Sequence, residues 1–390
     1  MNSRHAFLIA LLLIAANLRA AITGVGPVLE AIRADLALSA AAAGILASLP
    51  VLMFAAFAPL ARLAGRYGAE RMILGGLLVL IAGLILRSAG GAVALFAGTV
   101  VLAIGIASTN VLLPVVIKQR YPQQVPSMTM AYATVMGAMA ALASGVTIPL
   151  AQWLPGGWRA ALASWVVLAL AAWFAWLPHA RRPAGEVVDR PGAGQPSRDP
   201  PRLPLWRTPV AWYVTGFMGL QSTIFYVAVN WFPAILRDAG ISDATAGWLL
   251  TLYQVAALLA GMAVPQLIRR FRDQRTLAAG MAMLSLVAIV GILVAPGLAI
   301  LWVVVLGCGS GPSLILALSF IGLRASNHES ASRLSLLAQG GGYLFAGFGP
   351  VIFGLAYDHT GGWTLALLGV AGIAVGQALF GFGAGRSVKV

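Results

Sequence analysis

The chain has 390 residues, 60% of them hydrophobic and only 9% charged, and its mean hydropathy is +0.90. A soluble domain carries about 25% charged residues, so this composition excludes a soluble globular protein and indicates an integral membrane protein. The formal net charge is +14, but the basic residues lie in short gaps between apolar segments, so we expect no nucleic-acid partner. The single cysteine, Cys308, lies inside an apolar segment, which excludes a disulfide framework and a thiolate metal site.

Apolar segments of about 20 residues are long enough to cross a bilayer. The sequence contains twelve of them: 6–28, 41–60, 71–89, 93–117, 127–150, 159–177, 209–232, 245–268, 276–295, 298–322, 333–356 and 363–385. The gaps are short except for 178–208, which is polar, basic and rich in Pro and Gly, as flexible linkers are. We therefore predict an all-α integral membrane protein with twelve transmembrane helices. Its N-terminal six-helix half is 1–177, its linker 178–208 and its C-terminal six-helix half 209–390.

Lys and Arg predict the orientation of the chain, because they accumulate in cytoplasmic loops. When alternate gaps are assigned to opposite sides, one side holds 20 of the 25 basic residues, including those of the linker. The other side holds only Arg33, Arg87, Arg159 and Arg237, which leaves Arg19 within the membrane. We expect both termini and the linker on the cytoplasmic side of a bacterial-type inner membrane.

The two halves repeat each other at a spacing of about 204 residues. Asp35 corresponds to Asp238, Glu70-Arg71 to Gln274-Arg275, and Gly156-Gly157-Trp158 to Gly361-Gly362-Trp363. The matched positions fall in equivalent gaps, with the same orientation because six spans separate them. Parallel repeats of this kind place a substrate site at their interface, near the middle of the membrane.

The gap between the second and third spans contains the stretch ARLAGRYGAER, with Ala61, Gly65, Arg66, Gly68 and Arg71. Together with twelve spans and a long central linker, it resembles the major facilitator superfamily, whose signature loop is commonly G-x-x-x-D-R-x-G-x-R-[KR]. Gly65 replaces the usual acidic residue. The resemblance implies the major facilitator fold, transport by alternating access, and a gating loop formed by Arg66, Gly68 and Arg71.

Four further stretches resemble one branch of that superfamily, the cyanate permease and 2-nitroimidazole transporter family. They are NLRAAITGVGP (17–27), NVLLPVVIKQRYP (110–122), WFPAIL (231–236) and RDQR (272–275). The resemblance covers essentially the whole chain. It implies a solute like cyanate or a nitroimidazole, although members of the branch need not share a substrate.

Arg19 lies near the middle of the first apolar segment and keeps its charge, because arginine is not deprotonated in proteins. A charge at this depth costs about 2.5–3.5 kcal/mol on insertion scales. Four interpretations are open: a signal peptide preceding it, a side chain that extends to the interface, a structural bond to carbonyls of a neighbouring helix, or contact with a substrate. Substrate contact is the leading hypothesis.

All eleven acidic residues and all four histidines lie in gaps or at helix ends, with Glu30 closest to the membrane. A proton relay through a carboxylate or imidazole in mid-membrane is therefore not expected. The sequence also contains no P-loop, no H-E-x-x-H motif and no Cys/His cluster. We expect no enzyme activity, no catalytic residue, no metal site and no cofactor.

Neutral hydrogen-bonding and aromatic side chains remain within the apolar segments. With Arg19, the candidate substrate-binding residues are Asn110, Tyr132, Gln221, Tyr226, Asn230, Tyr253, Gln254, Gln339 and Tyr343. Tyr226 and Asn230 are four residues apart and share a helix face. For each residue an interhelical hydrogen bond, typically worth under about 1 kcal/mol, is an equally good explanation. As a set around one positive charge, they suit a small polar or anionic solute.

We therefore predict a secondary active or facilitative transporter of a small anionic or compact polar solute, working as a monomer in the lipid bilayer. The alternative is a multidrug-type exporter of larger amphipathic compounds, which the eleven Trp, eight Tyr and eleven Met favour. A cation exporter usually has a buried carboxylate, and the spans have none. A channel or receptor is a third class, but a channel would more naturally use symmetry around a pore.

Overall fold

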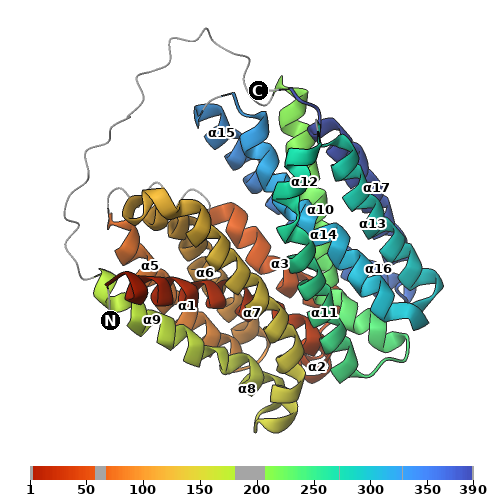
Figure 1. Cartoon of the computed structure of the whole chain (residues 1–390). Coiled ribbons are helices and arrows are strands. Elements are labelled where there is room, and N and C mark those ends of the chain that lie inside the picture. Colours follow the sequence, from red (N-terminus) through yellow and green to blue (C-terminus); the bar gives the residue numbers. More distant parts are fainter. Residues whose placement is uncertain (1–2, 58–66, 181–206, 272, 327, 389–390) are drawn as a thin grey trace.

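The computed structural model describes residues 3–57, 67–180, 207–271, 273–326 and 328–388, and their regular structure is helical (Figure 1). The first group of helices comprises α1 (Ser3–Thr23), α2 (Val25–Leu36), α3 (Ala40–Phe57), α5 (Ala69–Ser88), α6 (Ala92–Arg120), α7 (Val125–Trp153), α8 (Gly157–Ala163) and α9 (Trp165–Ala180). The second comprises α10 (Pro209–Asp238), α11 (Asp243–Met262), α12 (Val264–Arg270), α13 (Arg275–Val294), α14 (Ala299–Arg324), α15 (His328–Ser335), α16 (Gly342–Thr360) and α17 (Thr364–Ala384). A π-helical stretch, η5 (Leu336–Gly341), joins α15 to α16.

Eleven stretches of the described helices are long and apolar enough to cross a membrane, and each coincides with a predicted span. The remaining predicted span, 209–232, forms α10, a helix of 30 residues that is about 45 Å long at 1.5 Å per residue. Its Gln, Ser, Thr, Tyr and Asn residues make it more polar than the others, and 22 of its 30 residues are buried. The prediction of an all-helical membrane protein is confirmed, and α10 is the span most enclosed by protein.

The first predicted span is longer than expected and is broken at Gly24, between α1 and α2. The break is held by α7: Thr23 Oγ1 donates to the Ala140 carbonyl at 3.1 Å, and Ser144 Oγ donates to the Thr23 carbonyl at 3.4 Å. With α2 included, the segment reaches Leu36. Arg19 therefore lies midway along the longer segment as well.

The sequence repeat corresponds to a repeated contact in the structure. Asp35 accepts a hydrogen bond from Trp158 Nε1 at 3.3 Å, and its counterpart Asp238 accepts one from Trp363 Nε1 at 2.8 Å. Each tryptophan follows a Gly-Gly pair with positive φ, at Gly156 (+107°) and Gly157 (+61°) in one repeat and at Gly361 (+67°) in the other. The matched residues therefore bond to one another at equivalent places in the two groups.

A second repeated contact lies at the opposite end of the helices. Arg120 pairs with Glu70 at 3.1 Å and donates to the carbonyl of His179. About 204 residues later, Arg324 donates to the side-chain carbonyl of Gln274 and to the main-chain carbonyl of Gly385. The same arginine contact thus uses an ion pair in the first group and a neutral acceptor in the second.

The two groups meet closely at the end of the molecule that holds Leu36 and Asp238, which we call the α2 end. There the carboxylate of Asp358 on α16 accepts from the backbone N–H groups of Ala40 and Ala41, at 2.9 and 2.7 Å. It thus caps the first turn of α3. Glu30 pairs with Arg237 at 3.1 Å across the same end. We call the opposite end, where α9 stops and α10 starts, the linker end.

Two helix pairs continue this contact toward the middle of the molecule. Helix α3 packs along α16, and α7 packs along α11, as Figure 1 shows for the second pair. On α11, Thr251 Oγ1 donates to the Ala141 carbonyl at 2.9 Å, and Gln254 Nε2 donates to the Ala140 carbonyl at 3.1 Å. These bonds close the α2 end and bring both groups of helices around Arg19.

Candidate functional site

Arg19 projects from α1 toward the second group of helices. Its guanidinium carbon lies 5.2 Å from the centre of the Phe225 ring on α10. Its Nη1 is buried and has no hydrogen-bond partner among the described residues. A buried charged donor without an acceptor is costly, so Nη1 is available to a solute that enters the molecule.

Aromatic side chains from four helices surround this charge. Tyr226 on α10 packs with Tyr343 on α16, and Phe54 on α3 contacts Tyr343 at a ring separation of 6.3 Å. Phe225 contacts Tyr253 on α11, also at 6.3 Å. Phe225 also contacts its neighbour Tyr226, at a ring separation of 5.2 Å. The structure thus brings three of the predicted tyrosines, 226, 253 and 343, together around Arg19.

The hydroxyl of Tyr253 has a fixed partner, whereas other polar atoms near the centre do not. Tyr253 Oη and Ser310 Oγ on α14 are 2.9 Å apart, and the Tyr253 side chain is fully buried. Ser48 Oγ on α3 is buried without a partner among the described residues. The sequence analysis did not single out Phe54, Ser48 or Ser310, because serine and phenylalanine in apolar segments carry no distinctive signal.

The three predicted glutamines use their amide nitrogens within the protein. Gln221 Nε2 donates to the Met218 carbonyl and to Ser222 Oγ, and Gln339 Nε2 donates to Ser335 Oγ. Gln254 bonds across the interface between the two groups, to the Ala140 carbonyl. Only the Gln254 contact is the interhelical bond that the sequence left open, because Gln221 and Gln339 bond to residues one to four positions away.

The remaining candidates differ in their surroundings. Asn230 is buried, and its Nδ2 donates to the Tyr226 carbonyl at 2.7 Å. Tyr132 on α7 is partly buried and packs against the core of the first group. Asn110 on α6 is exposed. Neither Tyr132 nor Asn110 is among the described contacts of Arg19.

Arg87, counted in the sequence with the basic residues of one side of the membrane, is a second buried positive charge. It lies in the last turn of α5 and is only 1% exposed. Its Nη1 donates to the Ala21 carbonyl at 2.7 Å and its Nη2 to the Leu162 carbonyl at 3.5 Å. Because Ala21 stands two residues after Arg19, Arg87 braces the part of α1 that presents the central charge.

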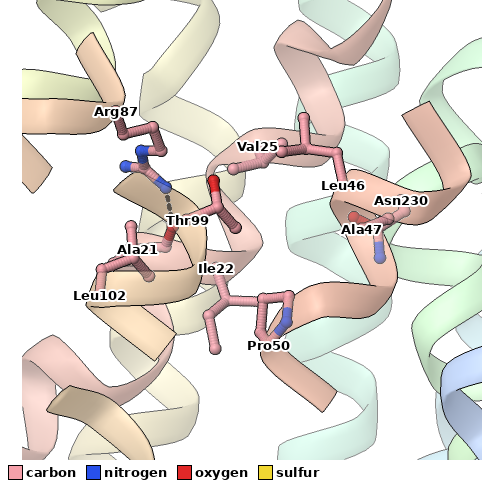
Figure 2. Close-up of a pocket in the computed structure, with 10 residues that line it drawn as sticks. All are labelled: Ala21, Ile22, Val25, Leu46, Ala47, Pro50, Arg87, Thr99, Leu102 and Asn230. Carbon is pink, nitrogen blue, oxygen red and sulfur yellow. Dashed lines mark hydrogen bonds between the residues drawn. The ribbon is translucent and has the colours of Figure 1, made fainter. Parts of the chain in front are cut away.

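Figure 2 shows this brace beside a small cavity that also touches Thr99 and Asn230. The cavity measures about 10 Å³, which is room for about one water molecule. Its other lining residues are apolar or proline. It is too small for a solute, so the brace is structural. We call Arg19, Phe225, Tyr226, Tyr253 and Tyr343 the Arg19 cluster.

The family of the chain follows from comparison with known proteins. A model described as the Major Facilitator Superfamily matches residues 9–329. The chain belongs to this superfamily. It is therefore a membrane transporter and not an enzyme, as the sequence predicted.

Three relatives extend over nearly the whole chain. The uncharacterized transporter YycB of Bacillus subtilis (strain 168) is 42% identical over 379 residues, 96% of this chain and 92% of that protein. The 2-nitroimidazole transporter of Escherichia coli (strain K12) is 41% identical over 397 residues, 100% of this chain and 98% of that protein. The cyanate transport protein CynX of the same organism is 28% identical over 375 residues, 94% and 95% of the two chains. The predicted resemblance to this branch is confirmed.

A solved structure agrees with the fold of this superfamily member. The crystal structure of peptide transporter POT matches with a TM-score of 0.78 at 13% identity, covering 98% of this chain and 95% of that one. At this identity the match shows the fold alone.

The superfamily's signature loop is described only in part. Arg66 lies outside the described residues, as do Ala61 and Gly65. Gly68 precedes α5 with φ of +83°, a left-handed conformation that favours glycine. Arg71 is exposed in the first turn of α5, beside the Glu70 that pairs with Arg120. The role of Arg66, Gly68 and Arg71 as a gating loop stays a prediction.

Proposed function

We propose that the protein carries a small anionic or compact polar solute by alternating access, with Arg19 as the group that binds it. The observation that carries this proposal is the buried Nη1 of Arg19, which has no partner among the described residues. Arg19 comes from the first group of helices and the rings of its cluster come from the second, so a solute held there contacts the two parts that move. A single chain then contains the complete site, in keeping with a monomer.

The chemistry of the Arg19 cluster favours a flat, electron-rich solute. A guanidinium presents a planar fork that matches carboxylate-like groups, and hydrogen bonds to a charged group are stronger than those between neutral groups. Aromatic rings on two sides offer flat apolar faces. The names of two relatives, a 2-nitroimidazole transporter and a cyanate transport protein, denote solutes of this size and shape.

The test is transport by the purified protein in liposomes. We expect saturable counterflow with at least one compound from a panel of cyanate, nitrate, small carboxylates and nitroimidazoles. The same compound at a hundred times its Kd should stabilise the protein by about 2.7 kcal/mol. Transport of large amphipathic dyes, with no counterflow of any panel member, would instead support a multidrug-type exporter.

We propose that the linker end, with both termini, faces the cytoplasm. The basic residues concentrate at this end of the described chain, for example Lys118, Arg120, Arg269 and Arg270. The positive-inside rule then sets the orientation of every span.

Cysteine labelling of intact bacteria tests this orientation. In a Cys308→Ser background, Gly91→Cys lies in open space before α6 and Ser127→Cys is exposed at the start of α7. A membrane-impermeant maleimide is expected to label Gly91→Cys in intact cells, and Ser127→Cys only after the cells are opened. The reverse pattern would invert the orientation, and labelling of both from outside would contradict a membrane-spanning α6.

A further inference from the structure

A groove of about 580 Å³ lies in the second group of helices, away from the Arg19 cluster. It is bounded by α11 and α12 on one side and by α13 and α14 on the other, and its lining is mainly apolar. The residues that matter for its shape are Leu267, Phe271, Thr276, Gly280, Leu284 and Cys308. None of them belongs to the proposed solute site.

The groove matches the depth of one membrane leaflet. It begins at the linker end, at Phe271 and Thr276, and reaches Leu284 on α13. From Thr276 to Leu284 the helix rises by about 12 Å. This is close to half the thickness of a hydrocarbon core of about 30 Å. A methyl group at Gly280 would meet nothing within 4 Å, so the space beside α13 is open along this length.

Positive charges stand at the mouth of the groove. Arg269 and Arg270 form the end of α12, directly before the lining residue Phe271, and both are exposed. Neither forms an ion pair with a described residue. Arg275, directly before the lining residue Thr276, is partly engaged by Asp273 at 3.5 Å. An apolar groove about one leaflet deep thus ends at the turn that carries two exposed arginines without an ion-pair partner among the described residues.

We infer that this groove binds an anionic phospholipid, with an acyl chain along α13 and the headgroup phosphate against Arg269 and Arg270. Lys and Arg side chains at the membrane surface attract anionic lipids, and basic pockets between membrane helices bind their headgroups. The apolar groove alone would accept any acyl chain, so the charge at its mouth selects the headgroup. This inference is independent of the solute.

The experiment measures lipid retained by the purified full-length protein in a neutral detergent. Native mass spectrometry and melting temperature are recorded with phosphatidylglycerol, phosphatidylcholine and inorganic phosphate in turn. Wild-type protein is expected to retain one phosphatidylglycerol at least fivefold more than phosphatidylcholine. Equal retention of the two lipids would overturn the inference, and so would an equal stabilisation by inorganic phosphate.

Three variants distinguish binding of the lipid headgroup from binding of the acyl chain. The double variant Arg269→Gln/Arg270→Gln should bind both lipids equally, while Gly280→Leu, which fills the open groove, should bind neither. Lys118→Gln, which changes an exposed lysine at the same end of the other group, is the control and should bind the lipids as wild type does. A preference that survives in the double variant, or that disappears equally in the control, would show a nonspecific charge effect and contradict the site.

Discussion

Replacement of Arg19 by Gln is expected to abolish solute transport while the protein still folds and inserts. The unpartnered Nη1 is the donor that meets the solute, and a hydrogen bond to a charged group contributes about 1.5–3 kcal/mol. Its loss should weaken binding by about 10- to 150-fold, since 1.4 kcal/mol is about tenfold in affinity. Insertion should not suffer, because removing a charge from the membrane interior lowers its cost.

Two matched variants distinguish a binding arginine from a structural one. Arg19→Lys keeps the charge but loses the planar fork, so we expect an intermediate loss of affinity. Arg87→Gln removes the donors to the carbonyls of Ala21 and Leu162. These buried carbonyls then lack a hydrogen-bond partner. It should lower the melting temperature and change the Kd of the folded protein much less than Arg19→Gln does.

The measurement is ligand binding and melting temperature on each purified variant, side by side, with counterflow in liposomes. If Arg19→Gln binds the solute with unchanged Kd but melts at a lower temperature, Arg19 is a structural residue. The proposed function would then lose its main support.

Substitution of Val for Gly44 or Gly354 is expected to block transport by preventing closure of the α2 end. A Cβ at Gly44 would lie 2.4 Å from the carbonyl oxygen of Pro350, and one at Gly354 would lie 2.3 Å from that of Ala40. Both obstacles are backbone atoms, so α3 and α16 must separate. Overpacking of this kind costs about 1–3 kcal/mol, which changes the ratio of two conformations by about 5- to 150-fold.

The rate at which a cysteine between α3 and α16 is labelled measures this change in conformation directly. In a Cys308→Ser background, Ser48→Cys replaces a fully buried residue of α3 and should react slowly with a water-soluble maleimide. Adding Gly354→Val should raise its rate of labelling at least fivefold and lower the transport rate correspondingly. Gly75→Val is the matched control, because a Cβ there meets nothing within 4 Å. Slow labelling and normal transport in the Gly354→Val variant would show that the α2 end does not open during transport.

The sequence alone predicted the helical class and the position of each span along the chain, but not the breaks within spans such as the one at Gly24. A bilayer imposes a minimum length of about 20 apolar residues on each span. The spans can therefore be recognised from the sequence without knowing which residues contact one another. It also predicted the repeat, and the Asp35–Trp158 and Asp238–Trp363 bonds show why those residues recur. The central position of Arg19 was evident too, because the residue lies in the middle of an apolar segment.

Only the tertiary structure decided which polar side chains meet. Lipid and protein interior are both apolar, so a hydrophobic span does not reveal which of its faces points inward. For that reason Tyr226, Tyr253 and Tyr343 could not be told from Asn110, which is exposed. The charge at the end of a span was equally ambiguous: Arg87 resembles a loop residue in the sequence, but three packed helices enclose it and give it carbonyl partners. Burial of such a group depends on neighbours more than 60 residues away along the chain. The local sequence does not show which residues those are.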